Sequence, residues 1–122
     1  SLLENKIVIC DRYVDSTMAY QGAGQKVNQK FLRDLIKEVT ENITPDLTFI
    51  FDMDVKHSLI RANKRDNSNN RYEKFDNNFH EQIRKYFLSL EDKDKRYVII
   101  NASDTIENIS KIILNKLNKI IV

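Results

Sequence analysis

Three short apolar runs, separated by stretches with helical periodicity, constrain the fold of this chain most strongly. They occupy residues 7–10, 47–51 and 97–100. Continuous runs rich in β-branched and aromatic residues are typical of strands buried on both faces of a parallel sheet. Strands that alternate with helices indicate an α/β fold with right-handed crossovers. We therefore predict an α/β chain with a three-stranded parallel sheet and flanking helices.

Apolar stripes at helical spacing predict the helices between and after these strands. One is expected after Asn28, one over residues 55–65, one after Asp76 and one after Asp104. Asp76 is suited to cap its helix, and Asp104 with Glu107 forms a plausible capping box. Residues 63–77 hold few apolar side chains, which predicts a loop.

Composition limits the classes of protein to which the chain can belong. Its 122 residues suit one domain, spanning residues 1–122. The 20 basic and 18 acidic residues nearly balance, which disfavours a generic nucleic-acid binder. No apolar run approaches the ~18 residues of a membrane span. The single cysteine, Cys10, cannot form an internal disulfide, so we expect a reducing compartment, the cytoplasm.

The segment DRYVDSTMAYQGAG, residues 11–24, concentrates polar chemistry directly after the first predicted strand. Ligands of open parallel sheets bind outside the carboxyl ends of the strands. Arg12 supplies a forked cation that matches phosphate. Neutral hydrogen-bonding groups and a flat apolar wall complete the set: Ser16, Thr17, Gln21 and Tyr20. The segment therefore predicts a pocket for a phosphorylated, planar, polar small molecule.

The same segment resembles the D-R-Y-x-x-S-x-x-A-Y-Q-G signature of bacterial thymidylate kinases, which pass phosphate from ATP to dTMP. PDLTFIFD, residues 45–52, resembles the family's PDLT strand. Residues 61–87 resemble its arginine-bearing lid and the following helix, and NASDTIENI, residues 101–109, its final strand-to-helix turn. The resemblance covers essentially the whole chain in the family's order. It implies a P-loop kinase-type parallel sheet.

One family hallmark is missing from the sequence. Nothing resembles the Walker A loop, G-x-x-x-x-G-K-[ST], and the only glycines are Gly22 and Gly24. The chain therefore resembles only the C-terminal portion of a thymidylate kinase, a partial domain with its lid at about residues 61–75. We expect little or no kinase activity from this chain alone. The resemblance also implies that the intact enzyme is a homodimer.

The resemblance implies roles on the dTMP side of the reaction. Arg12 would contact the dTMP phosphate and assist catalysis, while Asp11 would lie close to the phosphates and to the metal. Tyr20 would lie under the sugar and select deoxy substrates. The thymine edge would be bound by Ser16 and Gln21, with Thr17 beside them.

Structural roles remain open for several of these residues. Arg12 could instead pair with Asp11 or Asp15, Asp11 could cap the next helix, and Tyr20 could belong to the core. Gly22 is expected to give the backbone room for a turn.

On the donor side, the resemblance implies ATP as phosphate donor with Mg²⁺ as cofactor. Arg65 would stabilise the transferred phosphoryl group, and Arg61 would lie over the adenine. Three further lid residues would close on the phosphates: Lys64, Arg71 and Tyr72. The alternative is a solvated loop with scattered charges.

Other functions also remain open at this point. The chain could belong to another P-loop nucleotide kinase. It could also be a non-catalytic nucleotide-binding module, or a half-enzyme that pairs with a separate N-terminal half.

Overall fold

The computed structural model describes residues 2–65 and 76–121. The chain forms two compact units, Ser1–Asn42 and Ile43–Val122.

The first unit is helical. It contains a short 3₁₀ turn η1 (Leu2–Glu4), the helix α1 (Val14–Thr17), the π-helical segment η2 (Met18–Gly24) and the helix α2 (Gln29–Thr40). The Asn28 side chain caps α2 by accepting a 3.0 Å hydrogen bond from the Phe31 amide. The helix ends where Glu41 takes a left-handed backbone conformation. The helix predicted after Asn28 is therefore confirmed.

The first predicted strand is wrong. Residues 6–10 form neither a strand nor a helix, and Ile7 and Ile9 are 69% and 91% exposed. A strand requires hydrogen bonds from a neighbouring strand, and apolar composition alone does not supply one. The sheet consequently has two strands in the described residues rather than three.

The core of the first unit lies between η2 and α2. η2 buries Met18, Ala19 and Gly22, and α2 buries Leu32. Gly22 does not provide a left-handed turn, because neither glycine has a positive φ. A Cβ at Gly22 would lie 3.4 Å from Leu32 Cδ1, an ordinary van der Waals distance, so the contact of η2 with α2 leaves room for a methyl group but not for a large side chain.

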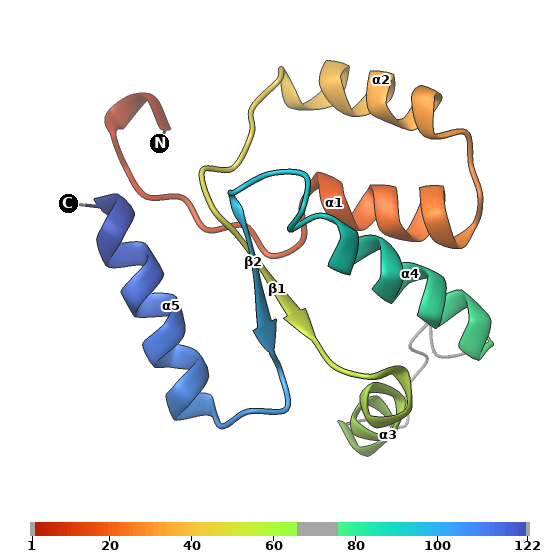
Figure 1. Cartoon of the computed structure of the whole chain (residues 1–122). Coiled ribbons are helices and arrows are strands. Elements are labelled where there is room, and N and C mark those ends of the chain that lie inside the picture. The colour runs from red at the N-terminus through yellow and green to blue at the C-terminus, as the bar shows by residue number, and fades with distance from the viewer. Residues whose placement is uncertain (1, 66–75, 122) are drawn as a thin grey trace. The chain divides into compact units, whose positions relative to one another are not determined.

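The second unit is an α/β arrangement built on two parallel strands, β1 (Thr48–Asp52) and β2 (Tyr97–Asn101). Their register pairs Thr48 with Tyr97 and Asp52 with Asn101. Three helices accompany the strands: α3 (Val55–Arg65), α4 (Asn77–Ser89) and α5 (Ile106–Ile121). α3 follows the carboxyl end of β1, and α5 runs back opposite to the strand direction (Figure 1). The α/β class with a parallel sheet is confirmed.

The helix ends of the second unit follow the predictions only in part. Asp76 caps α4 by accepting a 2.8 Å hydrogen bond from the Phe79 amide. The cap of α5 is one residue later than expected, because Thr105 Oγ1 accepts the Asn108 amide at 3.2 Å. The predicted capping box from Asp104 is therefore wrong. Residues 63–65 belong to α3 and residue 77 to α4, so the predicted loop 63–77 is wrong at both ends.

The core of the second unit is formed where α4 packs against β1. Ile50, Leu90 and Tyr97 are its buried centre. Half-buried side chains surround this centre: Tyr86, Phe87 and Ile99.

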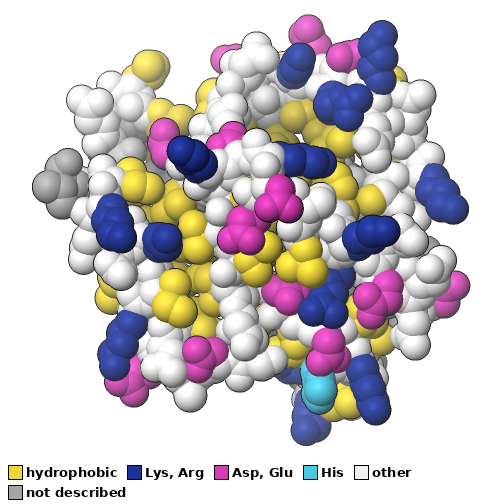
Figure 2. All heavy atoms as spheres, viewed as in Figure 1, with side chains coloured by type: hydrophobic (Ala, Val, Ile, Leu, Met, Phe, Trp, Pro, Cys, Tyr) yellow, Lys and Arg dark blue, Asp and Glu magenta, His cyan; other side chains and the backbone are white. Residues whose placement is uncertain are grey.

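Many apolar side chains remain at the surface, interspersed with charges of both signs (Figure 2). In the second unit they include Phe51 at 58% exposure and Ile106 at 81%. Within residues 2–65 and 76–121, none of the helices has both the length and the apolar character needed to cross a membrane.

The fit of Gly22 against α2 can be tested by substitution. Gly22→Ala should be tolerated or slightly stabilising, because its Cβ meets only ordinary contacts and alanine favours helix by up to about 1 kcal/mol. Gly22→Leu should cost about 1–3 kcal/mol through overpacking against Leu32. Thermal unfolding followed by circular dichroism measures both variants. A strongly destabilising Gly22→Ala would contradict this packing.

Candidate functional site

The predicted phosphate ligand, Arg12, lies in a strained position at the start of α1. Its φ is 61°, in the left-handed region that non-glycine residues rarely occupy. Its guanidinium carbon lies 5.8 Å from the centre of the Tyr20 ring, within the range of a cation–π contact. Strained backbone of this kind concentrates at functional sites. Arg12 and Tyr20, two of the residues predicted to bind dTMP, are thus brought together by an interaction that the sequence did not suggest.

The other residues predicted to bind dTMP line the same short helical stretch. Ser16 and Thr17 lie on α1 and Gln21 on η2, and all three are half-buried. The π-helical geometry is marked by the Gln25 amide, which donates to the Tyr20 carbonyl at 2.9 Å. π-helical segments are frequent at functional sites. The stretch therefore presents hydroxyl, amide and aromatic groups within two consecutive turns.

Asp11 is exposed and directly precedes Arg12. The N-cap residue of α1 is Tyr13, whose side chain makes no capping hydrogen bond. Asp11 is therefore not the N-cap residue of α1, and it is exposed to solvent.

A second group of polar residues lies at the carboxyl ends of β1 and β2. The Ala102 amide donates to the Asp52 carbonyl at 2.8 Å, which extends the ladder one residue past the strands. Arg61, from α3, donates from Nη1 to the Ala102 carbonyl at 3.4 Å. Asn101 Oδ1 accepts the Ser103 amide at 2.9 Å, which closes the turn. Arg61 is thereby held over the turn that resembled the family's final strand-to-helix connection.

The remaining lid residues are only partly described. Lys64 is exposed on α3, and Arg65 is the last residue of that helix. The side chain of Arg65 and both Arg71 and Tyr72 lie outside the described residues. The structure therefore brings Arg61 and Lys64 together on one helix and does not test the rest of the set.

An ion pair between Asp52 and Arg84 is the main feature that the sequence reasoning missed. Arg84 Nε and Nη2 donate to the two Asp52 carboxylate oxygens at 2.9 and 3.1 Å. The side chains are only 22% and 32% exposed for Asp52 and Arg84. Hydrogen bonding to Asp52 raises the pKa of Arg84 above its usual value. The pair attaches α4 to the carboxyl end of β1.

A signal for this pair was present in the sequence. Asp52 is the acidic residue that ends an apolar run, and Arg84 precedes Phe87 of the apolar stripe by three residues. Charged residues that are drawn toward a core are rarely buried without a partner of opposite charge, so these two positions were candidates for an ion pair.

Asp54 stabilises the start of α3 through contacts between its carboxylate and His57. One carboxylate oxygen accepts the His57 amide at 2.9 Å, and the other contacts His57 Nδ1. These hydrogen bonds, the amide first, lower the pKa of Asp54. His57 is thus engaged in capping contacts on an exposed helix surface.

The Asp52–Arg84 pair can be tested against a matched neighbour on the same helix. Arg84→Met should lower the free energy of unfolding by about 1–2 kcal/mol, because a partly buried carboxylate loses both charged donors. Lys85→Met removes the same charge from an exposed site and should change stability by less than about 0.5 kcal/mol. Urea unfolding followed by circular dichroism compares them. Equal effects of the two substitutions would rule out the pair as an anchor.

Comparison with known proteins agrees with this arrangement. A family model described as thymidylate kinase matches residues 1–113. A thymidylate kinase of Wolbachia pipientis wMel is 49% identical over 106 residues, and one of Onion yellows phytoplasma (strain OY-M) is 39% identical over 123 residues. These matches cover 86% and 98% of this chain but 52% and 59% of the relatives. The chain therefore spans about half the length of the curated relatives it matches.

A solved structure gives the same result for the fold. The crystal structure of thymidylate kinase from Ehrlichia chaffeensis matches with a TM-score of 0.64 and 28% sequence identity. The match covers 97% of this chain and 53% of that chain. Since the family model also spans most of the sequence, this chain belongs to the thymidylate kinase family.

Proposed function

We propose that this chain is the part of a thymidylate kinase that binds dTMP and carries the lid helices. The complete enzyme would transfer the γ-phosphate of ATP to dTMP, giving dTDP for dTTP synthesis. The observation that carries the proposal is the placement of Arg12 over Tyr20, at the start of a half-buried helical stretch that carries the family signature. The unpaired Cys10 fits a cytoplasmic enzyme.

On the acceptor side, Arg12 binds the dTMP phosphate in this proposal. Its charged fork matches the geometry of phosphate oxygens, and its exposure leaves it accessible. Tyr20 forms the wall beneath the sugar. The thymine edge is bound by the half-buried polar side chains that follow Arg12 on α1 and η2: Ser16, Thr17 and Gln21.

On the donor side, Arg61 lies against the adenine and Arg65 stabilises the transferred phosphoryl group. The hydrogen bond from Arg61 to the Ala102 carbonyl supports its part, because it fixes the guanidinium at the carboxyl edge of the sheet. Cations placed against the phosphoryl oxygens stabilise the charge of the transition state. The phosphates would also be contacted by Lys64, Arg71 and Tyr72.

Mg²⁺ fits this site through the nucleotide rather than through a protein cage. Among residues 2–65 and 76–121, no three His, Cys, Asp or Glu side chains are grouped to hold a metal ion. Mg²⁺ typically binds substrate phosphates with only one or two carboxylates. The exposed carboxylate of Asp11 is the protein ligand that we expect for it. When bound, the ion would neutralise charge on the phosphates.

The chain as given has no Walker A loop, so the β- and γ-phosphates lack their amide cradle and lysine. We therefore infer that dTMP binding and turnover are separable in this chain. A coupled ADP-release assay with dTMP and MgATP should show little or no turnover. Normal turnover would overturn this inference.

The binding site itself is tested by calorimetric titration with dTMP and thymidine. Arg12→Ala should weaken dTMP binding about tenfold or more, because charge-assisted hydrogen bonds contribute about 1.5–3 kcal/mol, and should leave thymidine binding unchanged. Arg33→Ala, which removes an exposed arginine from α2, is the matched control and should change neither affinity. Failure of the folded chain to bind dTMP would reject the acceptor-site proposal.

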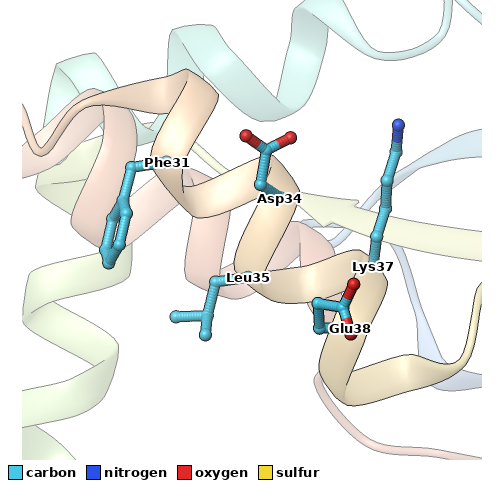
Figure 3. A pocket seen from close by; sticks show the side chains of 5 residues that line it. All are labelled: Phe31, Asp34, Leu35, Lys37 and Glu38. Atoms are coloured by element: carbon cyan, nitrogen blue, oxygen red, sulfur yellow. The ribbon is translucent and has the colours of Figure 1, made fainter.

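We also propose that the exposed face of α2 mediates dimerisation of the enzyme. Phe31, Leu35 and Val39 lie on its apolar stripe with 59%, 47% and 74% exposure. Phe31 and Leu35 project to the same side of the helix, where an open hollow is also lined by charged residues (Figure 3). The charged lining residues are Asp34, Lys37 and Glu38, which carry both signs. A two-fold interface pairs the same patch on both copies, so the apolar stripes would pack together and charges of opposite sign could pair across it.

Sedimentation equilibrium tests this dimer. Leu35→Gln should weaken self-association about tenfold or more, because an apolar side chain is lost from each copy at the interface. Arg33→Gln, at an exposed position of the same helix that does not line the hollow, is the control for a polar change and should have a much smaller effect. A strictly monomeric wild-type chain would contradict the proposal.

A further inference from the structure

The contact between Arg12 and Tyr20 joins two residues to which the proposed function gives separate tasks. Arg12 binds phosphate and Tyr20 supports the sugar in that proposal. The two groups lie 5.8 Å apart, from guanidinium carbon to ring centre. We propose that Tyr20 is a positioning residue for Arg12, so that removal of its ring weakens phosphate recognition specifically. This inference rests on the proposed function of the acceptor site.

The ring is the fixed partner in this contact. Tyr20 is half-buried in η2, between the fully buried Ala19 and the buried Gly22. Its carbonyl accepts the Gln25 amide at 2.9 Å, within the π-helical geometry. Because the neighbouring residues are in the core, the backbone of Tyr20 is held in place before any ligand binds, which limits where its ring can lie.

The Arg12 guanidinium is the group in this contact whose position is not set by the core. Arg12 is exposed, and a free arginine side chain loses considerable rotamer entropy when it is immobilised by a ligand. Its backbone conformation is already fixed. The φ angle is 61°, and the Cys10 thiol donates a hydrogen bond to the Arg12 carbonyl at 3.6 Å. The Tyr20 ring restrains the remaining freedom of the side chain. Pre-organisation of this kind strengthens binding by reducing the ordering cost.

One guanidinium can contact an aromatic ring and bind phosphate at the same time. A ring attracts the cation through its face, whereas phosphate oxygens accept hydrogen bonds from the N–H groups at its edge. Arg12 can therefore keep its contact with Tyr20 while it binds dTMP. A lysine has no planar fork and would not combine both contacts in this way.

The test compares dTMP with thymidine by calorimetry in four variants, one of which is a double variant. Tyr20→Leu should lower the ratio of dTMP to thymidine affinity by about 2- to 5-fold, the range expected for an exposed cation–π contact. Tyr20→Phe keeps the ring and should preserve the ratio, even if both affinities change. In an Arg12→Met background, Tyr20→Leu should have no further effect on the ratio. Equal loss of both ligands in Tyr20→Leu would overturn the positioning role and leave the dTMP site intact.

A measurement without ligand separates this inference from the proposed function. In NMR spectra, the Arg12 side-chain protons should show a ring-current shift that persists in Tyr20→Phe and disappears in Tyr20→Leu. Absence of that shift in the wild-type chain would reject the contact directly. If the shift is present but dTMP does not bind, the acceptor-site proposal fails, and with it the part of Tyr20 in phosphate recognition.

Discussion

The parallel pairing of β1 with β2 is the interaction on which the second unit depends. Its register places Asp52 beside Asn101, so both strands end at one level. The Arg84 fork then binds the Asp52 carboxylate and attaches α4 to this edge. At the opposite end, Arg96 donates to Thr48 Oγ1 at 2.7 Å from the residue before β2. The strand pair is thus secured at both ends, and its carboxyl edge is a defined platform for Arg61.

In the first unit, one short segment, η2, contributes side chains both to the core and to the candidate site. Met18, Ala19 and Gly22 of η2 are buried, while Tyr20 and Gln21 between them remain half-exposed. Packing of one side of the segment against α2 therefore determines where the other side presents its polar groups. This explains how a short π-helical segment can hold its polar side chains in defined positions.

The local features of the fold were predictable from the sequence. Helix α3 spans the predicted residues, α2 begins directly after Asn28 as expected, and Asp76 caps α4 as expected. These predictions succeed because a cap and its first turn involve residues only three positions apart. The misplaced cap of α5 shows the limit of such patterns. Asp104 and Thr105 are both good cap residues, and the turn from Asn101 decides between them.

The sequence by itself determined the helices α2 to α5, the parallel α/β class and the identity of the polar groups in the candidate site. Only the tertiary structure decided that residues 7–10 remain unpaired and that Asp52 meets Arg84 across 32 positions of the chain. It also decided that Arg12 rests against Tyr20. The physical reason is that helices and caps are stabilised by near neighbours in the chain. Strands and ion pairs depend on partners that only the folded chain brings within reach.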